Sequence, residues 1–178
     1  MLFKLFQIKK LQNLNKNKLG FKLDKHLIIT GASSGIGYAT AKLFQEDGYQ
    51  VINLSRSKIN LKNANHLTAD LSKRDWSNEV TKKLSSILTD SSEISLIHNA
   101  SMMQSDNVEN IDINNLRDIY EVNLVAPAIL NKIIIPYMKN GSSILYVGST
   151  LSEKAVPQMS SYVTSKHGMI GLMRSTCQ

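Results

Sequence analysis

The sequence predicts an α/β fold in which helices cover both faces of a doubly wound parallel sheet. Short apolar runs alternate along the chain with longer segments of helical periodicity, which is the pattern of strand–helix–strand units. A glycine-rich turn follows the first apolar run, and polar residues follow the later ones. Parallel strands joined by right-handed crossovers end at one edge of the sheet, where ligands bind. We therefore expect the functional residues at the carboxyl ends of the strands.

Composition and length predict one domain without a membrane span. The chain has 178 residues, enough to bury a substantial core. No apolar run approaches the length of about 18 residues that a spanning helix needs. Cys177 is the only cysteine, which excludes a disulfide framework and a cysteine metal cluster, and we expect no metal site. A reducing, cytoplasmic environment fits this composition.

The positive charge is concentrated near the N-terminus. The chain carries a net +7; seven lysines and Asp24 give residues 1–25 a net +6, which leaves +1 for the remaining 153 residues. The body therefore lacks the basic footprint of a nucleic-acid-binding protein. Apolar residues in 1–22 drift around a helical wheel and form no face. We interpret 1–22 as a loosely ordered basic extension and 23–178 as the folded domain. A segment bound to nucleic acid or a membrane surface is the alternative.

The first strand and its turn predict a dinucleotide-binding loop. Residues 26–30 are a short apolar strand, the glycine-rich turn 31–37 follows at once, and a helix then runs to near Gly48. Backbone without side chains can approach a pyrophosphate closely, and the helix amino terminus then faces the negative charge. The spacing is G-x-x-x-G-x-G. A glycine turn used only for structure is the alternative.

The end of the second strand indicates which nicotinamide cofactor fits. Residues 49–54 form this strand, and Ser55 and Arg56 follow it. A unit that binds NAD carries an acidic residue here for the ribose 2′-hydroxyl, whereas an arginine suits a 2′-phosphate. No carboxylate lies nearby in the sequence, so we favour NADP over NAD. A solvated loop arginine is the alternative.

Three further strands and two helices complete the expected order. The third strand, 66–69, ends at Asp70, and Ser72 is expected to cap the helix that carries the apolar positions from 76 to 88. The fourth strand, 94–97, ends in 98–101. After a polar loop, Asp112 opens a long helix that Pro127 should bend without ending, because the apolar pattern resumes to Met138. Asn140-Gly141 stops that helix, and 144–147 is the fifth strand.

The last strand and helix carry a candidate acid/base pair. Ser149 follows the fifth strand, and Tyr162 and Lys166 are four residues apart on the next helix, so they share one face. A fixed ammonium beside a phenol favours the phenolate and makes a tyrosine a usable acid/base. An exposed tyrosine and lysine on a helix surface are the alternative.

These residues together resemble the short-chain dehydrogenase/reductase family. Residues 30–37 match its T-G-x-x-x-G-x-G loop, and its N-N-A-G element is half kept as His98-Asn99-Ala100-Ser101. The resemblance, from about residue 24 to the end, implies a three-layer Rossmann-like sheet in the order 3-2-1-4-5. The catalytic residues it implies are Asn123, Ser149, Tyr162 and Lys166. The cofactor-binding residues are Gly31, Ser33, Ser34, Gly35, Ile36, Gly37, Arg56, Asp70, Leu71, Asn99, Ala100, Tyr162 and Lys166.

The resemblance also implies the reaction, a hydride transfer between a nicotinamide and a small-molecule carbonyl or alcohol. Tyr162 would give its proton to the carbonyl oxygen as hydride arrives. Lys166 would tune Tyr162 and hold the nicotinamide ribose, Ser149 would hydrogen-bond the substrate oxygen, and Asn123 would position a water. The residues 70 and 71 would contact adenine.

One departure from the family concerns length. Family members are typically longer, and the expected sixth and seventh strands and the helical lid over the substrate are missing from this sequence. The alternative function is therefore a catalytically impaired dinucleotide-binding or partner-binding fragment. A homo-oligomer is expected of a full-length relative. For the 178-residue chain we expect an uncovered edge at 144–147, poor solubility and little turnover.

Overall fold

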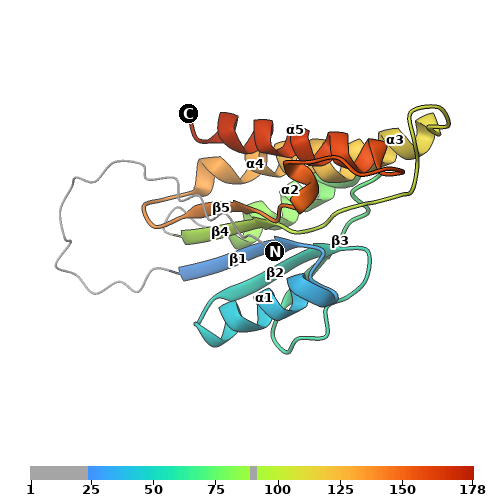
Figure 1. Cartoon of the computed structure of the whole chain (residues 1–178). Helices are drawn as coiled ribbons and strands as arrows, with labels where there is room; N and C mark the ends of the chain where they lie inside the picture. Colours follow the sequence, from blue (N-terminus) through green and yellow to red (C-terminus); the bar gives the residue numbers. More distant parts are fainter. Residues whose placement is uncertain (1–23, 89–91) are drawn as a thin grey trace.

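A five-stranded parallel sheet in the order β3-β2-β1-β4-β5 forms the centre of the molecule, as the sequence predicts (Figure 1). The computed structural model describes residues 24–88 and 92–178; the extension expected at 1–22 lies outside them. Each predicted strand is present, with ends shifted by one or two residues. The strands are β1 Asp24–Thr30, β2 Gln50–Ser55, β3 Asn65–Thr68, β4 Ser92–His98 and β5 Ser143–Tyr146.

Helices cover the two faces of this sheet unequally. Figure 1 shows α1 on one face and the other long helices on the opposite face. The α-helices are α1 Gly35–Glu46, α2 Trp76–Ile87, α3 Ile113–Tyr120, α4 Ala126–Ile134 and α5 Ser160–Thr176. Shorter turns are the π-helical η1 Glu121–Val125 and the 3-10 segments η2 Ile135–Tyr137 and η3 Thr150–Ser152.

Successive side chains of β1 point to opposite faces of the sheet, and this explains why the core has two layers. Leu27 and Ile29 point to the α1 face and pack in one cluster with Ala41 of α1. Ile28 points to the other face and packs in a second cluster that includes Leu130 of α4. All three strand residues are completely buried. Since each such side chain stabilises the fold by about 1.5–3 kcal/mol, β1 fixes both layers around it.

The cap expected at Ser72 is wrong, whereas Asp112, which opens the long helix, is a cap. Asp112 caps α3 by accepting hydrogen bonds from the backbone N–H groups of Asn114 and Asn115. Ser72 does not cap α2, which begins after Asp75. The N–H and the hydroxyl of Ser72 both donate to Asp70, at 3.1 and 2.8 Å. This local turn uses the hydroxyl that the cap would need.

The long helix after Asp112 continues past Pro127, as expected, and changes pitch just before it. The N–H of Ala126 donates to the carbonyl of Glu121, five residues back, within the π-helical turn η1. In the described residues, Ile113–Tyr137 is the one helix long and apolar enough to cross a membrane, by length and composition. Its residues Ile119 and Leu130 are fully buried, and Leu130 packs in one cluster with Ile28 of β1, as in a core helix.

Candidate functional site

The glycine loop between β1 and α1 has two positions where a side chain does not fit. Gly31 has φ +70°, a conformation that favours glycine, and a Cβ there would lie 3.0 Å from the Cα of Ala100. A Cβ on Gly37 would lie 2.5 Å from Nδ2 of Asn99 and 2.6 Å from the carbonyl oxygen of Gly31. The loop therefore packs backbone against backbone at the carboxyl end of β1.

Side chains from the two neighbouring strands hold this loop in place. Nδ2 of Asn99, after β4, donates to the carbonyl oxygens of Thr30 and Gly31 at 2.9 and 3.0 Å. Asn53 of β2 is fully buried, and its Oδ1 accepts from the N–H of Ala32 at 2.9 Å. Sequence reasoning missed Asn53, because an amide in an apolar strand carries no motif.

The first turn of α1 keeps its backbone donors free of side-chain partners. Ser34 is the N-cap residue, yet it makes no side-chain capping hydrogen bond, and the first turn contains no acidic residue. The first N–H groups of a helix and its positive dipole end attract anions. This end of α1 can therefore receive a phosphate group.

A pocket of about 620 Å³ opens beside this helix start, at the carboxyl ends of β1, β2 and β4. Eight of the expected cofactor residues line it: Gly31, Ser33, Ser34, Arg56, Asp70, Leu71, Asn99 and Ala100. Gly35, Ile36 and Gly37 belong to the first turn of α1 and do not line it. Tyr162 and Lys166 also lie outside its walls. Met102, Asp118 and Val122 are among the lining residues that sequence reasoning did not single out.

Asp70 keeps its charge in this pocket. Burial opposes ionisation, but hydrogen bonds from Ser72 and the nearby positive charge of Arg56 outweigh it and lower the pKa of Asp70 below its ordinary value. Leu71 beside it is buried. The pocket wall thus pairs an anionic acceptor with the exposed Arg56.

Tyr162 and Lys166 lie together on α5, as their spacing predicts. Nζ of Lys166 lies 5.5 Å from the centroid of the Tyr162 ring and donates to the carbonyl oxygen of Val147 at 3.2 Å. Lys166 is only 4% exposed, and this burial lowers its pKa to about 8. The Tyr162 hydroxyl has no hydrogen-bond partner among residues 24–88 and 92–178, so it is free to meet a ligand.

Asn123 is buried in η1 and uses its whole side-chain amide on protein partners. Its Oδ1 accepts from the N–H of Met102 at 2.8 Å, and its Nδ2 donates to the carbonyl of Met102 and to Oγ of Ser165, both at 2.9 Å. A water held by Asn123 would therefore have to use its backbone carbonyl. The residue four positions on is Pro127, which has no N–H to donate to that carbonyl.

Ser149, unlike the other three expected catalytic residues, caps a short helix and lines a separate cavity. Its Oγ accepts from the N–H of Leu151 at 3.1 Å, as the N-cap of η3. It lines a neighbouring cavity of about 460 Å³ together with Gly148, Met169 and other residues. No hydrogen bond in the described part of the chain joins it to Tyr162. The fold brings its segment against α5 without fixing the hydroxyl toward the phenol.

The element His98–Ser101 keeps its place without its family glycine. Among the described residues other than glycine, positive φ occurs at Asn63 and Gln158, so Ser101 adopts an ordinary backbone conformation. His98 is buried, its Nε2 lies 2.8 Å from Oδ1 of Asn131, and burial lowers its pKa to about 4. A neutral His98 thus ties the end of β4 to α4.

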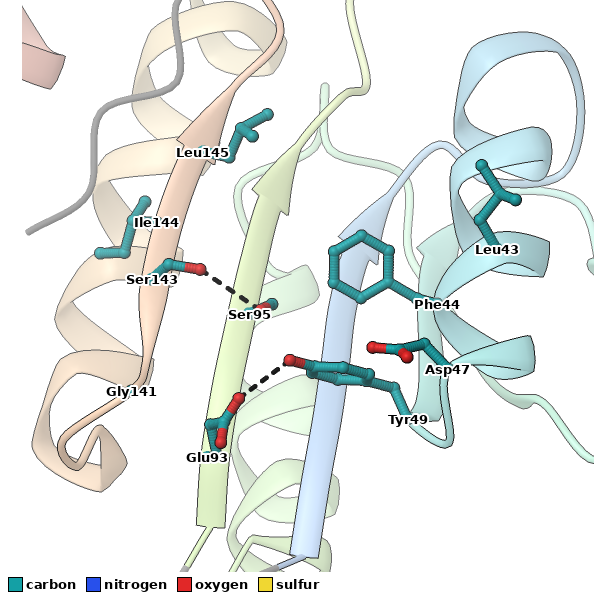
Figure 2. Close-up of a pocket in the computed structure, with 10 residues that line it drawn as sticks. All are labelled: Leu43, Phe44, Asp47, Tyr49, Glu93, Ser95, Gly141, Ser143, Ile144 and Leu145. Atoms are coloured by element: carbon teal, nitrogen blue, oxygen red, sulfur yellow. Dashed lines mark hydrogen bonds between the residues drawn. The ribbon is translucent and has the colours of Figure 1, made fainter.

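A third cavity, of about 420 Å³, lies at the other end of the sheet (Figure 2). Tyr49 and Glu93 meet there, with the Tyr49 hydroxyl donating to Oε1 of Glu93 at 2.9 Å. This cavity lies near the amino ends of β4 and β5, away from the edge where open α/β sheets bind ligands. Within the described residues, no group of three or more His, Cys, Asp or Glu side chains could hold a metal ion.

The family model for short chain dehydrogenases matches residues 25–178. That range contains the glycine loop, the strand ends and α5. This chain belongs to the short-chain dehydrogenase family. The relatives that it resembles are described as dehydrogenases and reductases.

Individual members of the family resemble the chain over most of its described length. The 3-oxoacyl-[acyl-carrier-protein] reductase FabG of Thermotoga maritima is 31% identical over 166 residues, covering 85% of this chain and 66% of the relative. The structure of 4-hydroxyisoleucine dehydrogenase complexed with NADH is 29% identical, with a TM-score of 0.74 over 84% of this chain and 67% of that one. A putative NAD(P)-dependent gluconate 5-dehydrogenase from Beutenbergia cavernae with bound NADP is 26% identical, with a TM-score of 0.74 over 86% and 66%.

The chain is shorter than these relatives. It spans between 50% and 66% of the length of four curated family members that it matches. The range that the family model matches contains the pocket beside α1 and the Tyr162–Lys166 pair.

Proposed function

We propose that the protein is an NADP-dependent oxidoreductase that transfers a hydride between the nicotinamide and a small-molecule carbonyl or alcohol. The observation that carries this proposal is the buried ammonium of Lys166 against the ring of Tyr162. The pair belongs to α5, whose neighbour η1 also supplies a wall of the pocket beside α1, through Val122. A tyrosine placed in this way can act as an acid or a base.

The residues of the pocket fit a dinucleotide. The positions of Gly31 and Gly37 exclude a Cβ, and the start of α1 offers N–H donors without a side-chain cap, which suits a pyrophosphate. Asp70 and Leu71 would receive the adenine. Lys166 would hold the ribose of the nicotinamide, as in the family that the chain resembles. The bound cofactor supplies or accepts the hydride.

Tyr162 would handle the proton of the reaction. In the direction of reduction, its hydroxyl would donate a proton to the carbonyl oxygen of the substrate, and in oxidation it would take that proton back. Lys166 would stabilise the phenolate left behind, because a positive charge near a phenolate lowers its free energy. Ser149 would donate its hydroxyl hydrogen to the same substrate oxygen, because the bond from the N–H of Leu151 uses only a lone pair of its Oγ.

A proton path from Lys166 to solvent would involve Asn123. Its side chain is bound to Met102 and Ser165, so the proposed water would bind its backbone carbonyl. Pro127, four residues on, has no N–H to donate to that carbonyl. A water at the Asn123 carbonyl would not touch the part of the cofactor in which NAD and NADP differ, so this path would serve either one.

The preference for NADP rests on the end of β2. Ser55, Arg56 and Ser57 line the pocket there, and none of them carries a negative charge that would repel a 2′-phosphate. The relatives do not decide this choice, because solved members are described with NADH and with NADP.

Calorimetric titration of the whole chain with each reduced cofactor tests the proposal. NADPH should bind more tightly than NADH, and Arg56→Ala should narrow the difference by weakening NADPH alone. Equal affinities in the parent chain would contradict the NADP preference. Tyr162→Phe should remove nearly all carbonyl reduction while NADPH affinity stays within about twofold, because the variant keeps the ring and loses only the hydroxyl that transfers the proton. Substantial turnover by this variant would refute the role given to Tyr162.

A further inference from the structure

The start of α5 is capped by a residue from a distant loop. Its own N-cap position, Met159, makes no side-chain capping hydrogen bond, and its first turn contains no acidic residue. Oδ1 of Asp106 accepts from the N–H of Ser161 at 3.0 Å, and its Oδ2 accepts from the hydroxyl of Ser161. Asp106 lies 55 residues earlier in the chain than Ser161. The residue it holds directly precedes Tyr162.

Backbone hydrogen bonds reinforce the same contact. The N–H of Asp106 donates to the carbonyl of Gln158 at 3.1 Å, and the N–H of Ser160 donates to the carbonyl of Asp106 at 3.4 Å. Asp106 and Met159 thus form an isolated parallel bridge. Asp106 therefore satisfies two of the N–H groups that a helix start leaves without partners, and its carboxylate faces the positive end of the helix dipole.

The segment 102–106 connects this cap to the cofactor pocket. Met102 lines that pocket, and both its N–H and its carbonyl are bound to the side chain of Asn123. Asn123 also donates to Oγ of Ser165, which in turn donates to the carbonyl of Tyr162 at 2.7 Å. Hydrogen bonds through the segment's two ends therefore reach the residue before Tyr162 and the carbonyl of Tyr162 itself.

We propose that Asp106 is a positioning residue for catalysis, one that fixes the first turn of α5, and with it the Tyr162 hydroxyl, relative to the pocket wall at Met102. This inference rests on the proposed function of Tyr162. Asp106 itself touches neither substrate nor cofactor in this account. Ser161 is 1% exposed, so without Asp106 its hydroxyl and N–H would be buried without their partner, and the turn would have to rearrange.

Two variants of Asp106 separate positioning from general stabilisation. In Asp106→Ala we expect kcat to fall by roughly ten- to a hundredfold, because displacements of about 1 Å at a reacting group have effects of this size. NADPH affinity and the KM for NADPH should change by less than about twofold, since Asp106 itself does not line the pocket beside α1. Asp106→Asn keeps an oxygen that can accept from the N–H of Ser161, so it should recover most of the lost kcat.

Asp112→Ala is the matched control. Asp112 caps α3 with two similar hydrogen bonds, at 2.8 and 3.0 Å, but has no contact with α5 through them. Both alanine variants should lower the melting temperature by a few degrees, as the loss of a helix cap does. Only Asp106→Ala should lower kcat. Equal kcat in the two alanine variants at a temperature where both are folded would overturn the proposal.

Hydrogen exchange provides a readout that does not need turnover. In Asp106→Ala the amides of residues 161–165 should exchange faster than in the parent, and Asp106→Asn should restore their protection. If the parent binds NADPH but reduces no carbonyl substrate, the function proposed above fails while this measurement still tests the cap. Unchanged exchange at 161–165 in Asp106→Ala would overturn the inference by itself.

Discussion

Helices α1 and α5 both begin near the carboxyl edge of the sheet, but their first turns differ in what they leave unbound (Figure 1). The start of α1 has no side-chain cap and no acidic residue, and it borders the pocket of about 620 Å³. The start of α5 also lacks a cap of its own, yet the carboxylate of Asp106 covers it. The start of α1 is open to an anion from a ligand, whereas the start of α5 is covered by the carboxylate of Asp106.

The difference separates two uses of the same physical feature. Free N–H groups at a helix start attract a negative group, whether it comes from a ligand or from the protein. At α1 the chain leaves this attraction for a ligand, and Asn53 and Asn99 hold the loop from the side. At α5 the chain satisfies it internally, and the result is a fixed position for Tyr162. The start of α1 would therefore bind the ligand's phosphates, and the start of α5 would hold Tyr162 in position.

The largest loss of stability and of NADPH binding should come from a side chain at Gly37, where the glycine loop packs closely. Gly37→Val would place side-chain atoms where even a Cβ lies 2.6 Å from the carbonyl oxygen of Gly31, so the loop must shift. We expect a loss of about 1–3 kcal/mol or more in the free energy of unfolding and no measurable NADPH binding. Thermal denaturation and calorimetry would check both.

Gly171→Ala is the control for that variant. Gly171 lies in α5, and a Cβ there would meet nothing within 4 Å. Alanine should therefore stabilise the helix by about 0.5–1 kcal/mol and leave NADPH binding unchanged. If Gly37→Val bound NADPH as tightly as Gly171→Ala, the close packing of the glycine loop would be irrelevant to binding.

Lys166→Met should stabilise the fold, by less than Gly37→Val destabilises it. Burial lowers the pKa of Lys166 from 10.5 to about 8, so at pH 7 the fold carries a buried charge at a cost. Removing it should raise the free energy of unfolding by about 1–2 kcal/mol, after allowance for the lost hydrogen bond to Val147. The same variant should have almost no turnover.

The pH dependence of stability gives this prediction a sign. Between pH 8 and 10.5 the unfolded chain holds a proton on Lys166 that the folded chain has lost, so the stability of the parent should rise with pH in this range. The rise should be smaller in Lys166→Met. Lys132→Met, at an exposed lysine of α4, is the control and should leave the profile unchanged. A destabilised Lys166→Met with an unaltered profile would contradict this account of Lys166.

The contrast between the two helix starts also explains which features were predictable from the sequence. The glycine loop is encoded in eight consecutive residues, 30–37, each with a local physical reason, and its strand, turn and helix follow in the structure. The parallel sheet was predictable from the alternation of strands and helices, and the strand order from the resemblance to the family. Tyr162 and Lys166 meet because a helix brings residues four apart together.

The parts that were not predictable depend on distant contacts or on competition between local ones. Nothing in the loop 101–112 marks Asp106 as the cap of a helix that begins 54 residues later. Ser72 looked like a cap for α2, but Asp70, two residues away, binds its hydroxyl first. Ser149 stands at the expected place in the chain, yet its hydroxyl accepts from Leu151. Ser72 and Ser149 bind partners two residues away, whereas Asp106 binds one 55 residues away.

Calorimetric titration of Ser34→Asp with NADPH shows whether the open first turn of α1 receives the cofactor's phosphates. A carboxylate at this N-cap should stabilise the chain without ligand by about 0.5–1 kcal/mol and repel the pyrophosphate. We expect NADPH affinity to fall by at least about tenfold, the equivalent of roughly 1.4 kcal/mol. An unchanged NADPH affinity in a well-folded Ser34→Asp chain would show that the phosphates bind elsewhere.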